Sequence, residues 1–448
     1  MTAYKTPGVY VEEIPKLPRS VAQVETAVPA FVGYTEKEGP GLKKPARITS
    51  LAEFQMMFGG PPDQDVAVNV TVEDNDITAI SVAADAPKYL MAHAIQMFYD
   101  NGGGPCYVVS VGGYSDTAMA EGPIVDGIAE LEKEDEPTLI VAPDAARLST
   151  SAKYKKVLDK ALGQCGSLMD RFAIFDIQTT VVDFRDQVGT ENLKYGAAYY
   201  PDLETSLNVA YTESDVTVTG LSEGDGVALS ALNDKDDAAF NNAAYNLIKD
   251  EIAKTPVVIP PSGAIAGAFA TVDRTRGVWK APANVSLKGV IKPTSRITDQ
   301  EQKDLNVHAS GKSINAIRAF TGRGTMVWGA RTLDGNSNEW RYVSVRRFFN
   351  MVEESVKKGT GWAVFEPNDA NTWVKVKAQI ENFLILQWRA GALAGAIPEE
   401  AFFVNVGEPV TMSSQDVLEG RMIVEIGMAA VRPAEFIVLR FSHKVQQA

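Results

Sequence analysis

The stretch TLIVAPDAARLSTSAKYKKVLDKALGQCGSLMDRFAIFDI, residues 138–177, decides the fold. It opens with an apolar run at Thr138–Ala142 and closes with another at Arg171–Ile177. Between them, the apolar residues of Ser151–Leu162 recur at helical spacing. Short apolar runs on either side of such a helix are typical of buried parallel strands joined by a crossover helix. The stretch therefore predicts a strand–helix–strand unit in an α/β sheet.

The same alternation of strand and helix patterns continues on both sides. Upstream, the sequence predicts a buried strand at Thr26–Thr35, a helix at Lys88–Asp100 and a strand at Cys106–Val111. Downstream, the sheet resumes at Val257, and further strands are predicted at Ile314–Ala319, Thr325–Gly329 and Arg341–Ser344. The longest predicted helix is Asn371–Leu393, with Asn371 as the candidate N-cap. We expect an α/β fold with an α+β body and mixed sheets.

Three segments depart from this alternation. Residues 66–84 alternate Val and Ile with polar residues and predict a small β-insertion. Residues 202–250 are acidic and rich in Asn, Ser and Thr, and predict a peripheral insertion with a strand at Val216–Val218 and a helix near Ala238–Ile252. Residues 260–300 mix Pro, Gly and Ala and predict an ordered loop over the core. The body is then 23–201 and 251–426.

Both ends of the chain predict short strands set apart by Pro. Residues 1–22 form an N-terminal arm and linker whose strand candidates are Val9, Tyr10, Val11 and Ile14. Residues 427–448 form a C-terminal arm whose strand candidates are Phe436, Ile437, Val438, Leu439 and Phe441. An unpaired strand edge pairs readily with another chain, although terminal strands commonly join their own sheet. The residues alone leave both alternatives open.

Composition places the chain among soluble globular proteins. Of 448 residues, 45% are hydrophobic and 22% charged, which suits folded domains with real cores. The formal net charge of -14, without a dense Lys/Arg block, argues against nucleic acid as a partner. No stretch approaches a membrane span or a signal peptide, so we expect no membrane insertion. Cys106 and Cys165 lack metal or disulfide spacing and fit a reducing cytoplasm.

The sequence gives no support for catalysis. The three histidines, His93, His308 and His443, lie near no carboxylate pair and at no metal-ligand spacing. Residues 310–313, SGKS, end like a phosphate-binding loop but lack its first Gly and its preceding strand. Ser262 lacks the nucleophile-elbow motif. We expect no catalytic residues, no cofactor and no metal, so an α/β enzyme is the least supported hypothesis for the function of this chain.

A series of ordered motifs resembles the contractile tail sheath family, the sheath subunits of phage tails, tailocins and bacterial contractile injection systems. The motifs are TPGVYVEE (6–13), TAVPAFVGYT (26–35), NGGGPCYVV (101–109), PPSGAIAGAFATVDRTRGVWKAPAN (260–284), NAIRAF (315–320), VWGARTL (327–333), WRYVSVRRFF (340–349), FEPN (365–368), GAL (391–393), PEEAFFVNVG (398–407) and RPAEFIVLRF (432–441). Two departures, at Asn405 and at Ala429-Ala430, do not affect the architecture, and the insertion 202–250 lies outside the shared pattern. The C-terminal sheath part spans about 305–426.

The resemblance implies a structural role. A sheath subunit polymerises into a helical homo-oligomer of stacked rings around an inner tube protein, between a baseplate and a terminator or cap protein. The assembly is metastable, and its contraction from the extended state drives the tube through a target envelope. Both terminal arms are donated to neighbours, where Val9–Ile14 and Phe436–Phe441 would pair with a small sheet. Pro15–Ser20 and Gly427–Pro433 would act as hinges.

The resemblance also implies contacts outside the arms. The helix near 371–393 lies close to the inner tube in the family, which makes Lys375, Lys377 and Arg389 candidate tube contacts. The pairs Arg346-Arg347 and Glu353-Glu354 are candidates for salt bridges in the lattice or for ordinary solvated charges. An alternative function is a non-contractile collar or baseplate-proximal polymer with the sheath fold. The subunit would be assembled in the cytoplasm as a component of a phage tail or phage tail-like particle, including one released outside the cell.

Overall fold

The computed structural model describes residues 20–438 and 440, except 75, 116–118 and 222–225. Its internal contacts divide the chain into two compact units, which are described separately below. The larger unit is Glu25–Met351 with Arg432–Ala448, and the smaller is Met1–Val24 with Val352–Val431. The arm candidates Val9, Tyr10, Val11, Ile14, Leu439 and Phe441 lie outside the described residues.

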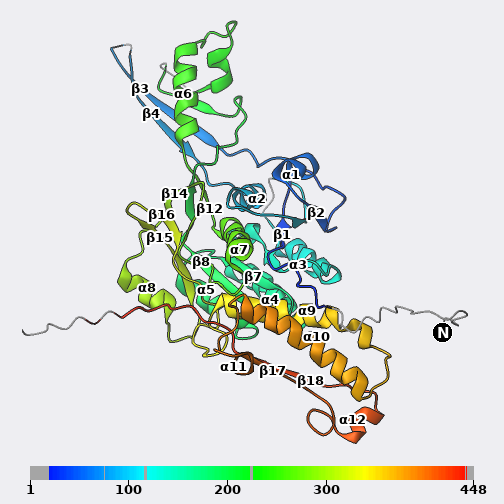
Figure 1. Ribbon diagram of the computed structural model, residues 1–448. Helices are drawn as coiled ribbons and strands as arrows, with labels where there is room; N and C mark the ends of the chain where they lie inside the picture. Colours follow the sequence, from blue (N-terminus) through cyan, green and yellow to red (C-terminus); the bar gives the residue numbers. More distant parts are fainter. Residues whose placement is uncertain (1–19, 75, 116–118, 222–225, 439, 441–448) are drawn as a thin grey trace, which may run out of the picture. The chain divides into compact units, whose positions relative to one another are not determined.

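The main sheet of the larger unit has nine strands among the described residues, in the order β13-β16-β15-β8-β7-β6-β1-β5-β2 (Figure 1). The strands from β15 to β5 pair in parallel, and those at the edges are antiparallel. The bounds are β1 (Pro29–Gly33), β2 (Ala46–Ile48), β5 (Cys106–Ser110), β6 (Leu139–Val141), β7 (Phe172–Asp176), β8 (Gly196–Tyr200), β13 (Val285–Ser286), β15 (Ile314–Phe320) and β16 (Gly324–Val327). The predicted α/β fold is confirmed, with β6, α4 (Ser151–Leu168) and β7 as its strand–helix–strand unit.

Helices cover both faces of this sheet. On one face lie α2 (Met91–Asp100) and α7 (Ser262–Arg276), and on the other lie α3 (Glu121–Glu130), α4 and α5 (Val181–Gln187). Strand β1 is buried on both sides: Phe31 packs in the α2 core, and its neighbours Ala30 and Val32 pack in the α4 core. This burial on both faces explains why the strands read as continuous apolar runs rather than as alternating patterns.

The loop prediction for 260–300 is wrong, because α7 occupies Ser262–Arg276. The Gly and Ala residues that suggested a loop allow α7 to pack closely on α2. A Cβ at Gly263 would lie 2.2 Å from the carbonyl oxygen of Ala94, and one at Gly267 would lie 2.5 Å from that of Phe98. These small residues are therefore a helix-packing surface. Two short strands follow the helix, β13 and β14 (Val290–Pro293).

The two predicted insertions combine into one lobe of the larger unit. Strands β3 (Val66–Glu73) and β4 (Asp76–Ala84) form a hairpin. Strand β10 (Thr217–Thr219) pairs in parallel with β3, and β11 (Val227–Ala228) pairs antiparallel with β10. Helix α6 (Asn242–Lys254) packs beside β4 (Figure 1). Residues 66–84 and 202–250 thus share a core. By contrast β9 (Leu203–Thr205), at the start of the second range, pairs with β12 (Val257–Ile259) and β14 in the body.

The strand predicted at Arg341–Ser344 is wrong, because α9 (Val343–Gly359) begins there. Only Tyr342 has strand character, in an isolated antiparallel bridge to Arg331. The run Tyr342–Val345 alternates in the manner of a strand, but the apolar residues that follow repeat at helical spacing and are buried. The remaining described elements of this unit are α1 (Leu51–Phe58), α8 (Asp299–Asn306) and the short 3-10 helices at 131–133, 143–147, 193–195 and 229–233.

The smaller unit is built on α10 (Ala370–Arg389), which packs against the hairpin of β17 (Phe402–Val406) and β18 (Val424–Met428). The predicted cap is wrong: Asp369, and not Asn371, caps α10 by accepting a hydrogen bond from the backbone N–H of Thr372 at 3.0 Å. Asp and Asn are equally good caps, so the sequence could not choose between them. The predicted arm boundary at 427 falls inside β18. Short helices at 361–363, α11 (Pro398–Ala401) and α12 (Ser414–Leu418) complete the unit.

Candidate assembly surfaces

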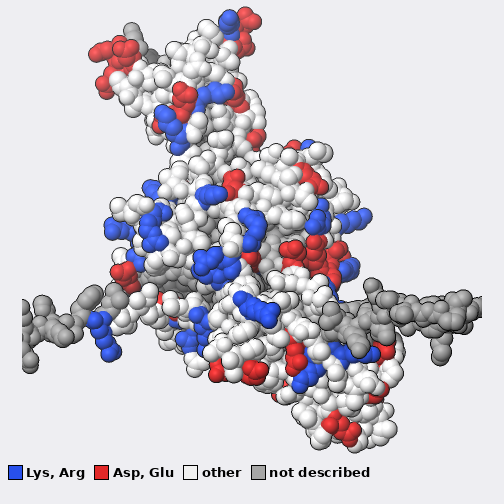
Figure 2. Space-filling model, viewed as in Figure 1, with Lys and Arg blue, Asp and Glu red and all other residues white. Residues whose placement is uncertain are grey.

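Among the described residues, no group of His, Cys, Asp and Glu could hold a metal ion, and no helix is long and apolar enough to cross a membrane. On the face shown in Figure 2, basic and acidic side chains are interspersed, and acidic ones gather near the β3–β4 turn. The features that stand out are instead strand edges and exposed apolar side chains. They are described below from the residues upward.

The β17–β18 hairpin has two outer edges. The backbone N–H of Ala429 donates to the carbonyl oxygen of Ala401 just beyond the hairpin, and the strands are in register from Phe402↔Met428 to Val406↔Val424. Because bonded and non-bonded pairs alternate in an antiparallel ladder, Val404 and Ile426 form a non-hydrogen-bonded pair. Their backbone N–H and C=O groups therefore point outward, one to each edge.

Among the described residues of this unit, backbone pairing covers the β18 edge at its C-terminal end only. Leu393 and Ala430 form an antiparallel bridge, in which Ala394 N–H donates to Ala429 O at 2.7 Å and Val431 N–H donates to Ala392 O at 3.1 Å. Residues Val424–Met428 have no further strand beside them among the described residues of this unit. A sheet of two strands with open edges can accept a strand on either side.

Residues Val21–Val24, at the end of the predicted N-terminal arm and linker, are held within the smaller unit. The backbone N–H of Val24 donates to Ser355 Oγ at 3.1 Å, and Gln387 Nε2 donates to Gln23 Oε1 at 3.3 Å. Val21 is only 7% exposed. The predicted N-terminal arm therefore leads into the smaller unit at Val21–Val24.

The C-terminal segment exposes a run of large apolar side chains. Phe436, Ile437 and Val438 are 71%, 80% and 76% exposed and lie in no strand. Consecutive apolar side chains exposed to this extent are typical of an interaction site. The structure therefore places three of the predicted exchange residues where another chain can reach them, whereas Leu439 and Phe441 lie outside the described residues.

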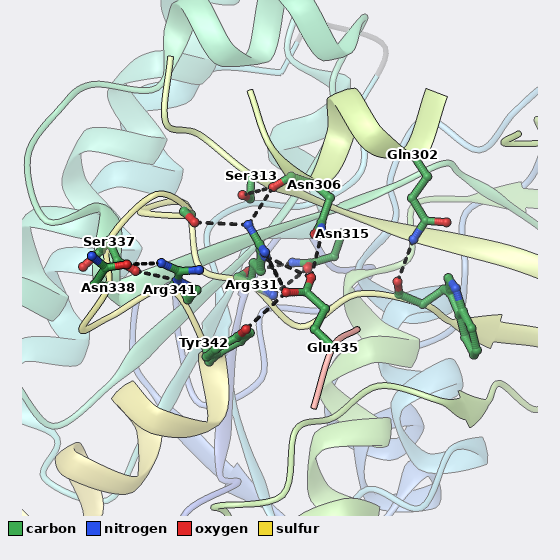
Figure 3. Close-up of polar contacts among 12 residues, drawn as sticks. Gln302, Asn306, Ser313, Asn315, Arg331, Ser337, Asn338, Arg341, Tyr342 and Glu435 are labelled. Carbon is green, nitrogen blue, oxygen red and sulfur yellow. Dashed lines mark hydrogen bonds and ion pairs between the residues drawn. The ribbon is translucent and has the colours of Figure 1, made fainter. Parts of the chain in front are cut away.

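A polar cluster at the start of this apolar run was not predicted from the sequence. Arg331 donates from Nε to Glu435 Oε1 at 3.0 Å and from Nη2 to Glu435 Oε2 at 2.6 Å (Figure 3). Asn306 Nδ2 donates to Glu435 Oε1 at 2.7 Å, and the Tyr342 hydroxyl donates to Oε2 at 3.2 Å. The one available signal was a single acidic residue in the otherwise apolar run AEFIVL.

The guanidinium of Arg331 is itself fixed. Its side chain is 4% exposed, and Nη1 donates to the carbonyl oxygens of Asn306 and Gly335. Burial alone would raise the pKa of the Glu435 carboxyl, but hydrogen bonds from Arg331, Asn306 and Tyr342 outweigh it and hold the pKa below its usual range. Glu435 is therefore held as a carboxylate.

The candidate tube contacts divide into two groups on α10. Lys375 and Arg389 are exposed and lie on one stripe of the helix together with the exposed Val374 and Leu386. Lys377 lies on another side of the helix and is near Glu381, with Nζ and Oε1 3.7 Å apart. The structure thus places two of the three predicted residues on one face of α10, about four helical turns apart.

The predicted lattice pairs are not free surface charges. The side chains of Arg346 and Arg347 are buried, and Arg347 forms an ion pair with Asp273 inside the larger unit. In the smaller unit Glu354 is 6% exposed and pairs with Lys357 and Lys358. For Arg346, Arg347 and Glu354, both predicted alternatives are wrong: the side chains form neither salt bridges in the lattice nor solvated surface charges. They are buried inside the subunit.

Comparison with known proteins identifies the fold. The phage tail sheath protein central domain matches residues 120–333, and the phage tail sheath C-terminal domain matches residues 336–444. A solved sheath complex of an extracellular contractile injection system, PVC, in its contracted state is 31% identical, with a TM-score of 0.68 over 99% of both chains. The chain belongs to the phage tail sheath family. Like its relatives, this sheath subunit is a structural component of a contractile, phage tail-like assembly.

Two further relatives define how far the similarity extends. The helical sheath of the anti-feeding prophage in its contracted state is 31% identical, with a TM-score of 0.68 over 99% of this chain and 100% of that one. The tail sheath protein of Vibrio phage KVP40 is 27% identical over 126 residues. That alignment spans 28% of this sheath subunit and 19% of the KVP40 protein. The similarity to the injection-system sheaths therefore covers the whole chain, and that to the phage protein covers a part.

Proposed function

We propose that this sheath subunit polymerises helically around an inner tube protein and contracts from a metastable extended state, which drives the tube through a target cell envelope. The observation that carries the proposal is the combination of an open two-stranded sheet with exposed apolar residues in the C-terminal segment. Two relatives that match the whole chain are sheaths described in a contracted state. Contraction would need no nucleotide, since the energy is stored when the extended lattice assembles.

Neighbouring subunits would be joined by strand exchange. We propose that Val9–Ile14 of one subunit and Phe436–Phe441 of another add to the outer edges of β17 and β18 of a third. About five ladder hydrogen bonds for each arm, at roughly 1 kcal/mol net each, would give several kcal/mol for each junction. Pro15–Ser20 would act as a hinge between the rigid parts during contraction. Of the predicted hinge Gly427–Pro433, only Arg432-Pro433 would do so, because residues 427–431 are hydrogen-bonded within the smaller unit.

Other partners would meet different surfaces. Lys375, Lys377 and Arg389 on α10 would contact the inner tube in the extended state. The ends of the sheath would meet baseplate and terminator or cap proteins. Assembly would take place in the cytoplasm, and the finished particle would be a phage tail or a contractile device that acts outside the cell.

Tube formation by the isolated subunit tests this function. We expect electron microscopy of the full chain at high concentration to show long hollow tubes. Deletion of residues 1–20 or 436–448 should leave a folded, soluble protein that forms none. Tubes of unchanged dimensions from either deletion variant would contradict strand exchange.

A baseplate-proximal collar is the second candidate. A chain from a solved baseplate of the anti-feeding prophage matches this one with 31% identity and a TM-score of 0.68, over 99% of this chain and 100% of that one. A collar protein would form single rings rather than tubes. Rings that do not extend at any concentration, with or without an inner tube protein, would favour this candidate.

A further inference from the structure

One side chain makes all the polar contacts of the described C-terminal segment of the larger unit. Among the described residues of 432–438, every hydrogen bond and ion pair is made by the carboxylate of Glu435. The backbone there lies in no helix or strand and makes no backbone–backbone hydrogen bond. The Glu435 side chain is 22% exposed, although the residue as a whole is exposed, and Phe436, Ile437 and Val438 are at least 71% exposed as whole residues.

The attachment site is preformed in the body. Asn315 fixes the backbone of Arg331, since its Oδ1 accepts from Arg331 N–H at 2.7 Å and its Nδ2 donates to Arg331 O at 2.8 Å. The isolated bridge between Arg331 and Tyr342 places both side chains beside the carboxylate (Figure 3). Only Nε and Nη2 of Arg331 face the C-terminal segment, and both are bonded to Glu435.

This arrangement differs from an ordinary surface ion pair. Arg331 is almost fully buried, so loss of the carboxylate would leave its guanidinium without a partner for two of its nitrogens, away from bulk solvent. A planar guanidinium that meets both oxygens of a carboxylate also fixes direction, because the two groups must remain coplanar. The site therefore specifies where the chain leaves the body as well as holding it.

We propose that Glu435 is the pivot of the C-terminal arm: it fixes the point on the subunit from which the apolar strand starts. The strand residues begin one position later, at Phe436, so the arm can swing about a fixed origin while the body stays rigid. This inference rests on the proposed strand exchange for its purpose. The anchoring itself is a property of the isolated subunit and can be measured before any assembly.

A distance measurement between two spin labels tests the pivot. One label is placed at Phe436→Cys and the other at Met56→Cys, which is 77% exposed in α1 of the same unit. The native Cys106 and Cys165 are buried, so labelling is selective. Pulsed electron paramagnetic resonance on the full chain, below its assembly concentration, should give one narrow distance distribution. The change Glu435→Ala should at least double its width.

Two further variants make the result specific. Glu435→Gln keeps the shape and loses the charge, and Tyr342→Phe removes one hydrogen bond, so both should broaden the distribution less than Glu435→Ala. Asp299→Ala, which removes a surface partner of Arg318, should leave it unchanged. An unchanged width in Glu435→Ala, or a native distribution already as broad as that of the variant, would overturn the pivot. If Glu435→Ala fails to fold, the comparison of Glu435→Gln with the native chain decides.

Tube formation separates this inference from the proposed function. Tubes formed after deletion of 436–448 would contradict strand exchange, even where the labels show a fixed arm. Conversely, a loss of tubes after that deletion, together with no broadening in Glu435→Ala, would retain strand exchange and reject the pivot. Support for both the pivot and strand exchange requires that Glu435→Ala broadens the distance distribution and that the same variant reduces the yield of tubes at least severalfold.

Discussion

Arg347 and Asp273 form an ion pair inside the larger unit, with Nη2 and Oδ2 2.5 Å apart. Their side chains are only 3% and 6% exposed. Thr26 completes the site: its hydroxyl donates to Asp273 Oδ2 at 2.6 Å, and its carbonyl oxygen accepts from Arg347 Nη2 at 2.9 Å. Three segments far apart in the sequence are thus fastened together, namely the entry to β1, the end of α7 and the start of α9.

Asp273→Ala should therefore destabilise the larger unit strongly. The change leaves the buried guanidinium of Arg347 without its carboxylate, and the expected loss is about 3–5 kcal/mol. Urea unfolding of the unassembled chain measures it. Asp299→Ala removes the partner of Arg318 on the surface, where Asp299 is 88% exposed, and should cost less than about 1 kcal/mol. Equal effects of the two changes would contradict a structural role for the buried pair.

Glycines in two helices should respond to Ala in opposite directions. At Gly263 in α7 an added Cβ would lie 2.2 Å from the backbone oxygen of Ala94, so Gly263→Ala should cost about 1–3 kcal/mol through overpacking. Gly163 in α4 has no atom within 4 Å of the added Cβ. There Gly163→Ala should stabilise by about 0.5–1 kcal/mol, because Ala favours the helix. Thermal unfolding of both variants measures these changes. A loss of stability in both would mean that the close approach of α7 to α2 does not explain the effect of Gly263→Ala.

The two helices that contain these glycines show which elements could be predicted from the sequence and which could not. The unit at 138–177 was predicted correctly because its strands are buried on both faces and its helix has a clear apolar stripe. The helix at Ser262–Arg276 was missed because it is buried almost all round. Its small residues serve close packing against α2, and no periodic pattern of apolar and polar residues marks it.

The candidate sites were predictable to a different extent. The exchange strands follow from a local pattern and from the family resemblance, and Phe436–Val438 are indeed exposed. The Glu435 cluster depends on residues brought together from α8, from the loop after β16 and from the start of α9, which no local pattern reveals. For Arg347, the sequence shows a charged pair but not its partner Asp273, 74 residues away.

Stability should fall as the pH rises from about 4 to about 7, because of a buried carboxyl. Burial raises the pKa of Asp176, at the end of β7, from 3.8 to about 7. The folded protein thus keeps a proton that the unfolded chain loses near pH 4, and stability is lost progressively between about pH 4 and 7. Asp176→Asn removes this loss, so its stability relative to the native chain should grow by roughly 2–3 kcal/mol from pH 5 to pH 8.

Asp183→Asn is the matched control for this pH effect. Hydrogen bonds from Thr180 and Thr179 lower the pKa of Asp183, so that this carboxyl is ionised in both states above pH 5. Its stability difference from the native chain should be the same at pH 5 and pH 8. Urea unfolding at the two pH values measures both variants. A constant difference for Asp176→Asn would show that its carboxyl is already ionised in the folded protein.

Proline on the outer edge of β18 should block assembly without unfolding the subunit. The N–H of Ile426 points away from β17, so Ile426→Pro breaks no hydrogen bond of the hairpin but removes a donor that an added strand needs. We expect a folded monomer by circular dichroism and no tubes by electron microscopy. Ile426→Thr keeps the N–H and should still form tubes. Tubes from Ile426→Pro would mean that this edge accepts no strand.

Replacing the exposed basic residues of α10 with neutral ones should weaken the binding of the sheath to the inner tube. Lys375 and Arg389 share one face of the helix, and each exposed charge contact contributes up to about 0.7 kcal/mol. The double variant Lys375→Gln/Arg389→Gln should thus bind purified inner tube protein roughly tenfold more weakly at low salt, with little difference at 1 M salt. Co-assembly at increasing ionic strength, counted by electron microscopy, measures this loss.

The control for this last prediction lies on the neighbouring helix of the same unit. Lys357 in α9 is 70% exposed and pairs with Glu354, so Lys357→Gln removes an exposed charge that does not belong to α10. It should leave tube binding unchanged, and both this variant and the double variant should still form sheath tubes on their own. If the double variant binds the tube as tightly as the native chain at every salt concentration, the basic face of α10 does not contact the tube. Lys377, half-exposed beside Glu381, would then be no better a candidate, since its charge is already paired within the subunit.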